Sequence, residues 1–524
     1  MSAGAIGQWL DLFMMIALCT LIMTGVPVVF VLTGCAIVFA GLGILFGAFD
    51  AFLLGALAQR VFGTMTSEVL IAIPLFIFMG MMLEKSRIAP ELLEAMGRLF
   101  GSLRGGLAIA VTLVGALLAA STGIVGATVV TMGLIALPAM MRHRYRADFA
   151  CGTICAAGTL GQIIPPSTVM VILGEVLAGA YQQAQLAQGK FSVESISVGQ
   201  LFAGSMLPGL MLAGLYILYQ VVLCWLKPEA GPAMPRSARE AVSAGDLAKA
   251  LVPPIALIVA VLGSILAGIA TPTEAAAVGA VGATLLAGLR LGGGPAWPIL
   301  AAAAAAVALG VLGSVFDMRI GREAPAPAEA VAMWVALGLA VVLAYGIAVA
   351  LRRAFGGGVL GGVSQSTMTV TAMIFATLIG ATLFALVFRG LGGDEMIRGF
   401  LESLPGGKYG ALLVVMLVIF LLGFPLDFVE LVIIVVPIVG PVLLQMDIDP
   451  IWLGVLIAMN LQTSFLTPPL GPTLFYLQSV LPEGVTARDV YRGVTPFVLV
   501  QLVGLGLVVT FPALATWLPD VLFK

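Results

Sequence analysis

The chain has 524 residues, of which 61% are apolar and only 10% are charged. Soluble chains average about 25% charged residues, so this composition excludes a water-soluble globular protein and indicates an integral membrane protein surrounded by lipid. The formal net charge is −2, and no basic patch is interleaved with aromatic residues, which excludes nucleic acid as a partner.

Apolar segments of the length that a bilayer-spanning helix needs, about 20 residues, recur along the whole chain. The first apolar run, 9–49, is long enough for two spans with a break near residues 24–27. We assign residues 1–67 to N-terminal scaffold helices. The amphipathic stretch Pro90–Arg104 is expected to be an interfacial helix.

Segment 105–141 is predicted to be a re-entrant helical hairpin rather than two full spans. Basic residues flank it on both sides, so the positive-inside rule places both flanks in the cytoplasm. Its polar break, Ser121–Gly123, comes after 16 residues, or about 24 Å of helix. That length falls short of the roughly 30 Å hydrocarbon core. We assign residues 68–182 to a first repeat that contains this hairpin.

The same pattern of helix breaks returns 303 residues later. Residues 137–168 align without a gap with residues 440–471, and the matched prolines are Pro138 with Pro441, Pro165 with Pro468, and Pro166 with Pro469. The basic loop 142–146 corresponds to the acidic segment 445–449, so the second hairpin, 410–445, is expected to open to the opposite side. Two such hairpins, each followed by a proline-broken helix, predict an inverted repeat with a binding site near the membrane midplane.

The rest of the chain is assigned around these two repeats. Residues 199–292 are expected to be scaffold and connecting helices, 363–493 the second repeat, and 494–524 a C-terminal helix. Residues 293–362 differ in composition, with unbroken alanine at 301–306, and are predicted to form an inserted pair of spans. The predicted fold is an all-α polytopic membrane protein.

The helix breaks are the candidate ligand positions, because unpaired backbone groups inside a membrane are tolerated only against protein or a cavity. Carbonyl and hydroxyl oxygens suit Na⁺, and helix N-termini offer partial positive charge to an anion. The alternative for each hydroxyl is a hydrogen bond back to its own helix. The hydroxyl residues in or beside the breaks are Ser121, Thr122, Thr159, Ser167, Thr168, Thr463, Ser464 and Thr467.

Intramembrane carboxylates are candidates as well. Asp427 lies at the second hairpin tip, with Glu430 one turn later. Asp427 either caps the helix that begins at Phe428 or contributes charge to the site, and one carboxylate can do both. Glu175 is expected near a membrane edge in contact with solvent, and Glu274 is expected to be the structural first-turn acid of a helix.

The charged and sulfur-containing side chains suggest no other site. Cys151 and Cys155 share one helix face one turn after Asp148, a spacing that would also fit a metal, but the lone histidine, His143, lies in the adjacent basic loop. We interpret the cysteines as small apolar side chains. Lys and Arg are expected at segment ends or in loops, which leaves none at mid-bilayer to neutralise an anion. Bound Na⁺ is then the natural source of positive charge.

Several local strings resemble a known family. The segments 73–80, 164–167, 268–277 and 427–441 are similar to those of the large membrane subunit of tripartite ATP-independent periplasmic (TRAP) transporters. The string Thr-Pro-Thr-Glu-Ala-Ala-Ala at 271–277 is highly specific to that family. The resemblance covers most of the chain apart from 293–362.

The resemblance implies a sodium-driven, elevator-type importer in the bacterial inner membrane. It implies two partners: a small membrane subunit and a soluble periplasmic solute-binding protein that delivers the substrate. The small subunit is expected to be a separate chain, because too few spans precede Ile73. The implied substrates are small organic anions, mostly carboxylates such as dicarboxylates or 2-oxoacids, and the binding protein largely selects among them.

The resemblance also implies the ligands of the co-transported Na⁺ at the hairpin tips and neighbouring broken helices: Ser121, Thr122, Gly123, Thr463, Ser464 and Thr467. The helix breaks themselves point to Pro166, Thr168, Asp427 and Pro469 as substrate contacts. The main alternative is a standalone divalent-anion:sodium symporter, which needs no binding protein. A membrane enzyme would need clustered acids or a His/Cys set, which the sequence lacks.

Overall fold

The computed structural model describes residues 3–86, 88–122, 125–190, 192–234, 244–317 and 327–523. These residues form helices joined by turns and irregular segments, with no strand among them. Eleven helices in this part of the chain are long and apolar enough to cross a membrane, or up to 13 if each of two bent helix pairs counts as one span. The predicted all-α polytopic membrane fold is confirmed.

The first hundred residues fold into one short 3₁₀ turn and five helices. They are α1 (Ala3–Ile22), α2 (Val28–Leu45), η1 (Ala51–Gly55), α3 (Ala56–Thr66), α4 (Glu68–Lys85) and α5 (Ile88–Phe100). Residues 51–66 bend by 48° into α4, a geometry that fits either one broken span or a re-entrant loop. Arg60 therefore lies in the middle of a helix, and the expectation that every basic residue lies at a segment end or in a loop is wrong for it.

Two groups of helices correspond at the predicted offset of 303 residues. The first group is α6 (Gly106–Thr122), α7 (Val125–Arg142), α8 (Ala147–Thr159), η2 (Leu160–Gln162) and α9 (Thr168–Ala187). The second is α17 (Gly407–Leu422), α18 (Phe428–Gln445), α19 (Pro450–Leu466) and α20 (Pro472–Gln478). The turn residues Arg144 and Asp447, which are matched by the offset, both have positive φ, 60° and 64°. The correspondence thus extends to the backbone of the turns.

The two groups are related by an approximate two-fold axis. Helix α9 packs on α18, and the equivalent α20 packs on α7. The Gln462 Nε2 donates a hydrogen bond to Thr159 Oγ1 at 3.2 Å. Since these two residues are themselves 303 positions apart, the axis must pass close to this bond.

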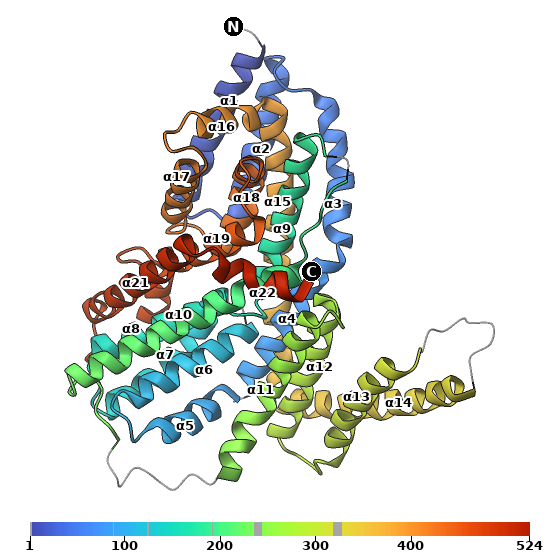
Figure 1. Cartoon of the computed structure of the whole chain (residues 1–524), viewed down its shortest axis with the longest axis vertical. Coiled ribbons are helices and arrows are strands. Elements are labelled where there is room, and N and C mark those ends of the chain that lie inside the picture. Colours follow the sequence, from blue (N-terminus) through green and yellow to red (C-terminus); the bar gives the residue numbers. More distant parts are fainter. Residues whose placement is uncertain are drawn as a thin grey trace.

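The hairpins approach from opposite ends of one long helix, α15 (Val359–Leu391). Near its first end, the Lys85 Nζ donates to the Gly362 carbonyl at 2.8 Å, and α5 then leads the chain into the first hairpin. At its other end, α16 (Gly393–Glu402) leads the chain into the second. Helices α5 and α16 accordingly lie at opposite ends of the molecule (Figure 1). This is the arrangement that an inverted repeat requires.

The remaining helices surround the repeats or project from them. They are α10 (Val198–Leu226), α11 (Ala244–Leu266), α12 (Pro272–Arg290), α13 (Trp297–Val315), α14 (Pro327–Gly356), α21 (Ala487–Thr510) and α22 (Ala513–Phe523). Helices α13 and α14 are the predicted inserted pair and extend sideways from the body (Figure 1). Trp334 on α14 is 75% exposed, as suits a lipid-facing helix.

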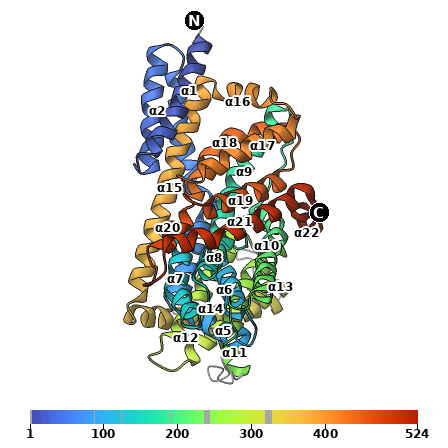
Figure 2. The same cartoon turned by 90° about the vertical axis from the view of Figure 1, so that its left-hand side faces the viewer.

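Helices of the two repeats pack closely against the helices around them. Figure 2 shows α15 with α1 and α2 on one side and α18 on the other, and all three pack against it. Helix α8 approaches α21 through glycines: a Cβ at Gly152 would lie 2.1 Å from the Gly493 carbonyl oxygen. Small residues at such crossings let membrane helices come into backbone contact.

Candidate functional site

A cavity of about 450 Å³ lies where the two repeats meet α4 and α15. Three helices begin at its wall, because Val125 of α7, Thr168 of α9 and Phe428 of α18 are among the lining residues. The first N–H groups of a helix have no partner within the helix, and each N-terminus carries roughly half a positive charge. The cavity therefore offers three helix N-termini to an anion, of which the N-terminus of α18 carries the Asp427 carboxylate at its cap.

Four lining side chains carry polar groups: Gln162, Thr168, Asp427 and Tyr476. The sequence analysis named Thr168 and Asp427 as substrate contacts, and the structure brings both to this cavity. It missed Gln162, which is 1% exposed and whose Oε1 has no hydrogen-bond partner in the described part of the chain. The signal was an amide directly before the Ile-Ile-Pro-Pro break. No Lys or Arg is among the described lining residues.

Asp427 is both a helix cap and a residue of the cavity wall, the two roles that the sequence left open. It is the N-cap of α18 with extended backbone angles, φ −71° and ψ 158°. Its N–H donates to the Glu430 carboxylate at 3.2 Å, which is one half of a capping box. The same residue lines the cavity, so capping and contact with the site coexist.

We expect Asp427→Asn to retain uptake within about threefold of the native rate, because Asn caps a helix nearly as well as Asp. The substitution also removes a negative charge from a wall that faces an anion. Initial uptake rates in proteoliposomes measure this. Asp449→Asn is the matched control, because Asp449 caps α19 by accepting from the Trp452 N–H at 2.8 Å and is not among the cavity's lining residues. Loss of uptake in Asp427→Asn alone would show that the site needs this carboxylate charge.

The two predicted prolines lie at the breaks beside the cavity. Pro166 is buried and Pro469 is exposed, and neither is among the lining residues. Both follow cis peptide bonds, Pro165–Pro166 and Pro468–Pro469. The helices are interrupted at these prolines, and α9 begins after the first interruption, at Thr168.

At the second hairpin tip, the structure joins α17 to α19 through Ser464, one of the predicted Na⁺ ligands. The Ser464 Oγ donates to the Phe420 carbonyl at 2.7 Å. A Cβ at Gly423 would lie 2.5 Å from the Ser464 Oγ, so glycine is required for this approach. A buried serine oxygen, 0% exposed, thus lies against the carbonyl-rich end of α17.

The two predicted threonine ligands beside it bond to their own helix. Thr463 Oγ1 donates to the Met459 carbonyl at 2.8 Å, and Thr467 Oγ1 donates to the Thr463 carbonyl at 2.7 Å. This is the alternative that the sequence analysis kept open. A hydroxyl that donates its proton keeps two lone pairs, so these oxygens can still face a cation.

The first hairpin tip falls largely outside the described residues. Ser121 and Thr122 end α6, but their side chains and all of Gly123 lie outside the described part. The Na⁺ assignment of these three residues therefore stays a prediction.

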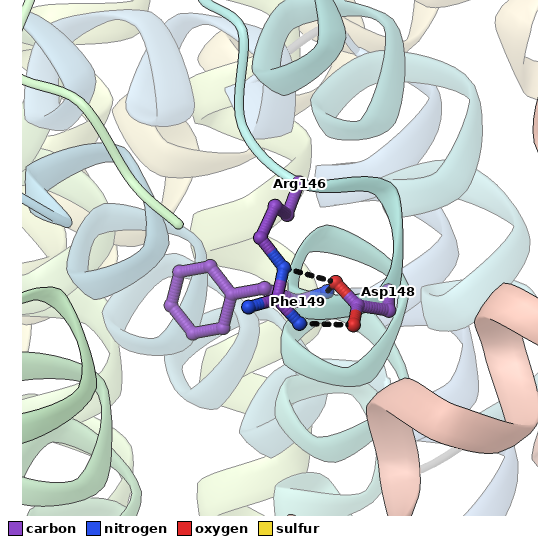
Figure 3. A network of polar contacts seen from close by, with 3 residues as sticks. All are labelled: Arg146, Asp148 and Phe149. Carbon is purple, nitrogen blue, oxygen red and sulfur yellow. Dashed lines mark hydrogen bonds and ion pairs between the residues drawn. The ribbon is translucent and has the colours of Figure 1, made fainter. Parts of the chain in front are cut away.

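At the start of α8, Asp148 is bound by the loop before it and by its own helix. Arg146 Nε donates to Asp148 Oδ1 at 3.0 Å, and a second bond joins Arg146 Nη2 to Asp148 Oδ2 (Figure 3). The Phe149 N–H also donates to Asp148, at 2.7 Å. Asp148 is thus engaged by the loop and its own helix, and the described residues contain no group of three potential metal ligands.

Two polar contacts join the repeats to the ends of α4. The Ser67 Oγ donates to Glu175 on α9 at 3.1 Å, and Thr131 on α7 donates to Glu84 at 2.8 Å. The half-buried Glu175 carboxylate is thus held between two helices. The expectation that it contacts solvent near a membrane edge stays a prediction.

Comparison with known proteins shows which family this chain and its fold resemble. A sequence model of the family "Tripartite ATP-independent periplasmic transporter, DctM component" matches residues 14–316 and 294–514. The C4-dicarboxylate TRAP transporter large permease protein DctM of Pseudomonas aeruginosa is 31% identical over 468 residues, 89% of each chain. The ectoine/5-hydroxyectoine TRAP transporter large permease protein UehC of Ruegeria pomeroyi is 24% identical over 504 residues, 96% of this chain and 97% of that one. The solved YdaH transporter of Alcanivorax borkumensis has a similar fold, with a TM-score of 0.56 and 15% identity, and the match covers 89% of this chain and 90% of that one.

Proposed function

The chain belongs to the DctM family of tripartite ATP-independent periplasmic transporters, and on that basis we propose that it couples sodium entry to the import of a small organic anion. As a large permease subunit it is a transporter component and not an enzyme. We place it in the bacterial inner membrane, with the basic loop 142–146 in the cytoplasm. Carboxylates such as dicarboxylates or 2-oxoacids are the proposed substrates, as the C4-dicarboxylate name of the Pseudomonas aeruginosa relative supports.

The observation that carries this proposal is the convergence of three helix N-termini on a cavity with no described Lys or Arg in its wall. Helix ends alone offer partial charges of roughly half a unit each. A dianion therefore needs a further positive charge within the site. Sodium held at the two hairpin tips supplies that charge without a basic side chain.

The proposed Na⁺ ligands are Ser121, Thr122 and Gly123 at the first tip, and Thr463, Ser464 and Thr467 at the second. The proposed substrate contacts are Gln162, Thr168 and Asp427 on the cavity wall, with Pro166 and Pro469 shaping the breaks. Sodium and anion then stabilise each other in the site. By reciprocal linkage, each raises the affinity for the other.

The proposed movement is of elevator type, with the helix groups α6–α9 and α17–α20 as the moving body. Helices α4 and α15 line the cavity from outside these two groups, so the anion lies between a moving and a fixed part. The contacts of Ser67 with Glu175 and of Glu84 with Thr131 join these parts. They would have to break when the repeats slide.

The proposed function is tested by the dependence of uptake on the two proposed partner proteins. We expect uptake in proteoliposomes to need three components in addition to a sodium gradient: this chain, the small membrane subunit and the substrate-loaded periplasmic binding protein. Omission of the binding protein should reduce uptake to background. Robust uptake by the isolated chain at low substrate concentration would contradict the proposal and favour the standalone symporter.

A further inference from the structure

A second cavity, of about 190 Å³, lies farther along the same helices as the central one. Helices α9, α15 and α18 line both cavities. On α15, the lining passes from Ile374 in the central cavity to Thr382 and Arg389 in the second. These positions are about 12 and 22 Å farther along the helix axis. The two cavities therefore follow one another along the boundary between the repeats and α15.

Two arginines line this second cavity, Arg60 from α3 and Arg389 from α15. Both lie on helices outside the groups α6–α9 and α17–α20, whereas α9 and α18 of these groups form the opposite wall. Arginine within a membrane-spanning region is costly and marks a functional site by default. Neither residue contributes to the central cavity.

The Arg389 guanidinium is held by a backbone carbonyl of α18 and by Asp394. Residue 441 is a proline and has no N–H, so the Pro437 carbonyl lacks its helical donor. The Arg389 Nη2 supplies that donor at 3.2 Å. The Arg389 Nε lies 3.5 Å from Asp394 Oδ2, and the arginine side chain is 21% exposed. The guanidinium is thus fixed at the cavity wall.

Arg60 is not neutralised in this way. The described residues place no carboxylate within salt-bridge distance of its guanidinium, whereas Arg389 has Asp394. Glu175 also lines the cavity, but its Oε1 accepts from the Ser67 hydroxyl at 3.1 Å. The lining thus carries two guanidinium groups and one carboxylate, and Arg60 supplies the positive charge that has no carboxylate partner among the described residues.

We propose that Arg60 and Arg389 form a capture site that binds the transported carboxylate before it reaches the central cavity. The inference rests on the proposed function. Guanidinium groups match carboxylates in shape and charge. The cavity lies at the end of α15 that leads into α16, opposite the end held by Lys85, and the positive-inside rule places that end toward the periplasm. A substrate released by a periplasmic binding protein arrives on that side.

The test uses the reconstituted complex of both membrane subunits, with a cysteine at Thr382 on the cavity wall. We measure its modification by an anionic sulfonatoethyl and a cationic trimethylammonioethyl methanethiosulfonate added from outside. The anionic reagent should react at least about fivefold faster, because a positive cleft concentrates anions. Arg60→Gln and Arg389→Gln should each remove most of that preference, Arg60→Lys should keep it, and succinate should slow the reaction.

Arg398→Gln is the matched control, because Arg398 pairs with Glu402 on the exposed face of α16 at 2.9 Å and should leave the preference unchanged. Equal rates for the two reagents, no labelling by either, or a preference that survives Arg60→Gln would each overturn the proposal. Protection by anionic lipid but not by succinate would assign the cavity to a lipid headgroup and also overturn it. Labelling needs neither a sodium gradient nor the binding protein, so its failure is separate from failure of the proposed function.

Discussion

Replacement of Gln162 by leucine is expected to raise the concentration of loaded binding protein that gives half-maximal uptake by about tenfold to a hundredfold, the range of a lost hydrogen bond to a charged group. Gln162 is buried at the cavity wall, and its amide oxygen has no partner among the described residues. An unpaired buried amide is costly until a ligand satisfies it. A bound sodium ion would satisfy this oxygen, whereas a carboxylate has no proton to donate to it, so the loaded state is expected to be favoured by the sodium that accompanies the anion.

The design of the Gln162→Leu experiment separates a lost contact from a damaged fold. Leucine keeps the approximate volume of the side chain, so the helix break should remain packed. Gln188→Leu is the control, because Gln188 lies at the far end of α9 and donates to the Gln445 carbonyl at 3.2 Å. Native uptake by Gln162→Leu would show that the amide does not contact the transported species.

Replacement of Thr463 by valine is expected to raise the sodium concentration for half-maximal uptake by about tenfold, by analogy with a lost charge-assisted contact. Valine keeps the shape of threonine but removes the oxygen that we propose as a sodium ligand. The loss of the bond from Thr463 to the Met459 carbonyl should matter little to folding, since the helix does not depend on such bonds. The affinity of the binding protein for its substrate should not change.

Two variants control this measurement. Thr463→Ser restores the hydroxyl and should restore the sodium response. Thr495→Val removes an equivalent bond, from Thr495 to the Tyr491 carbonyl at 2.8 Å on the exposed face of α21, and should behave like the native chain. An unchanged sodium response in Thr463→Val would remove Thr463 from the proposed ligands.

Local signals allowed much of this fold to be predicted from the sequence. Glu274 was expected to be a structural first-turn acid, and it forms a capping box with Thr271, donor and acceptor lying three residues apart. The matched breaks follow from prolines, whose effect on a helix depends on the chain itself. A cap at Asp427 was one of the two alternatives read from local sequence, and α18 does begin at Phe428.

Features that depend on distant partners were missed. The contact of Glu175 with Ser67 was not predicted, because nothing nearby in sequence marks a partner 108 residues away. The position of Arg60 within a helix was not predicted, because residues 50–67 are not apolar enough to suggest a span, although residues 51–66 continue into α4 as one bent helix pair. Gln162 was passed over because a single amide in an apolar helix is usually structural. Only the folded arrangement shows that it lines a cavity.

The most direct test of the central claim is the driving force of uptake in proteoliposomes that contain both membrane subunits, with loaded binding protein outside. A sodium gradient imposed at constant pH should drive accumulation of the labelled carboxylate. A pH gradient imposed without sodium should not. We base this on a central cavity whose described wall has no basic side chain and offers three helix N-termini beside the proposed sodium sites. Accumulation that is indifferent to sodium but follows the pH gradient would contradict sodium coupling and would direct attention to Asp427 and Glu430 as proton carriers.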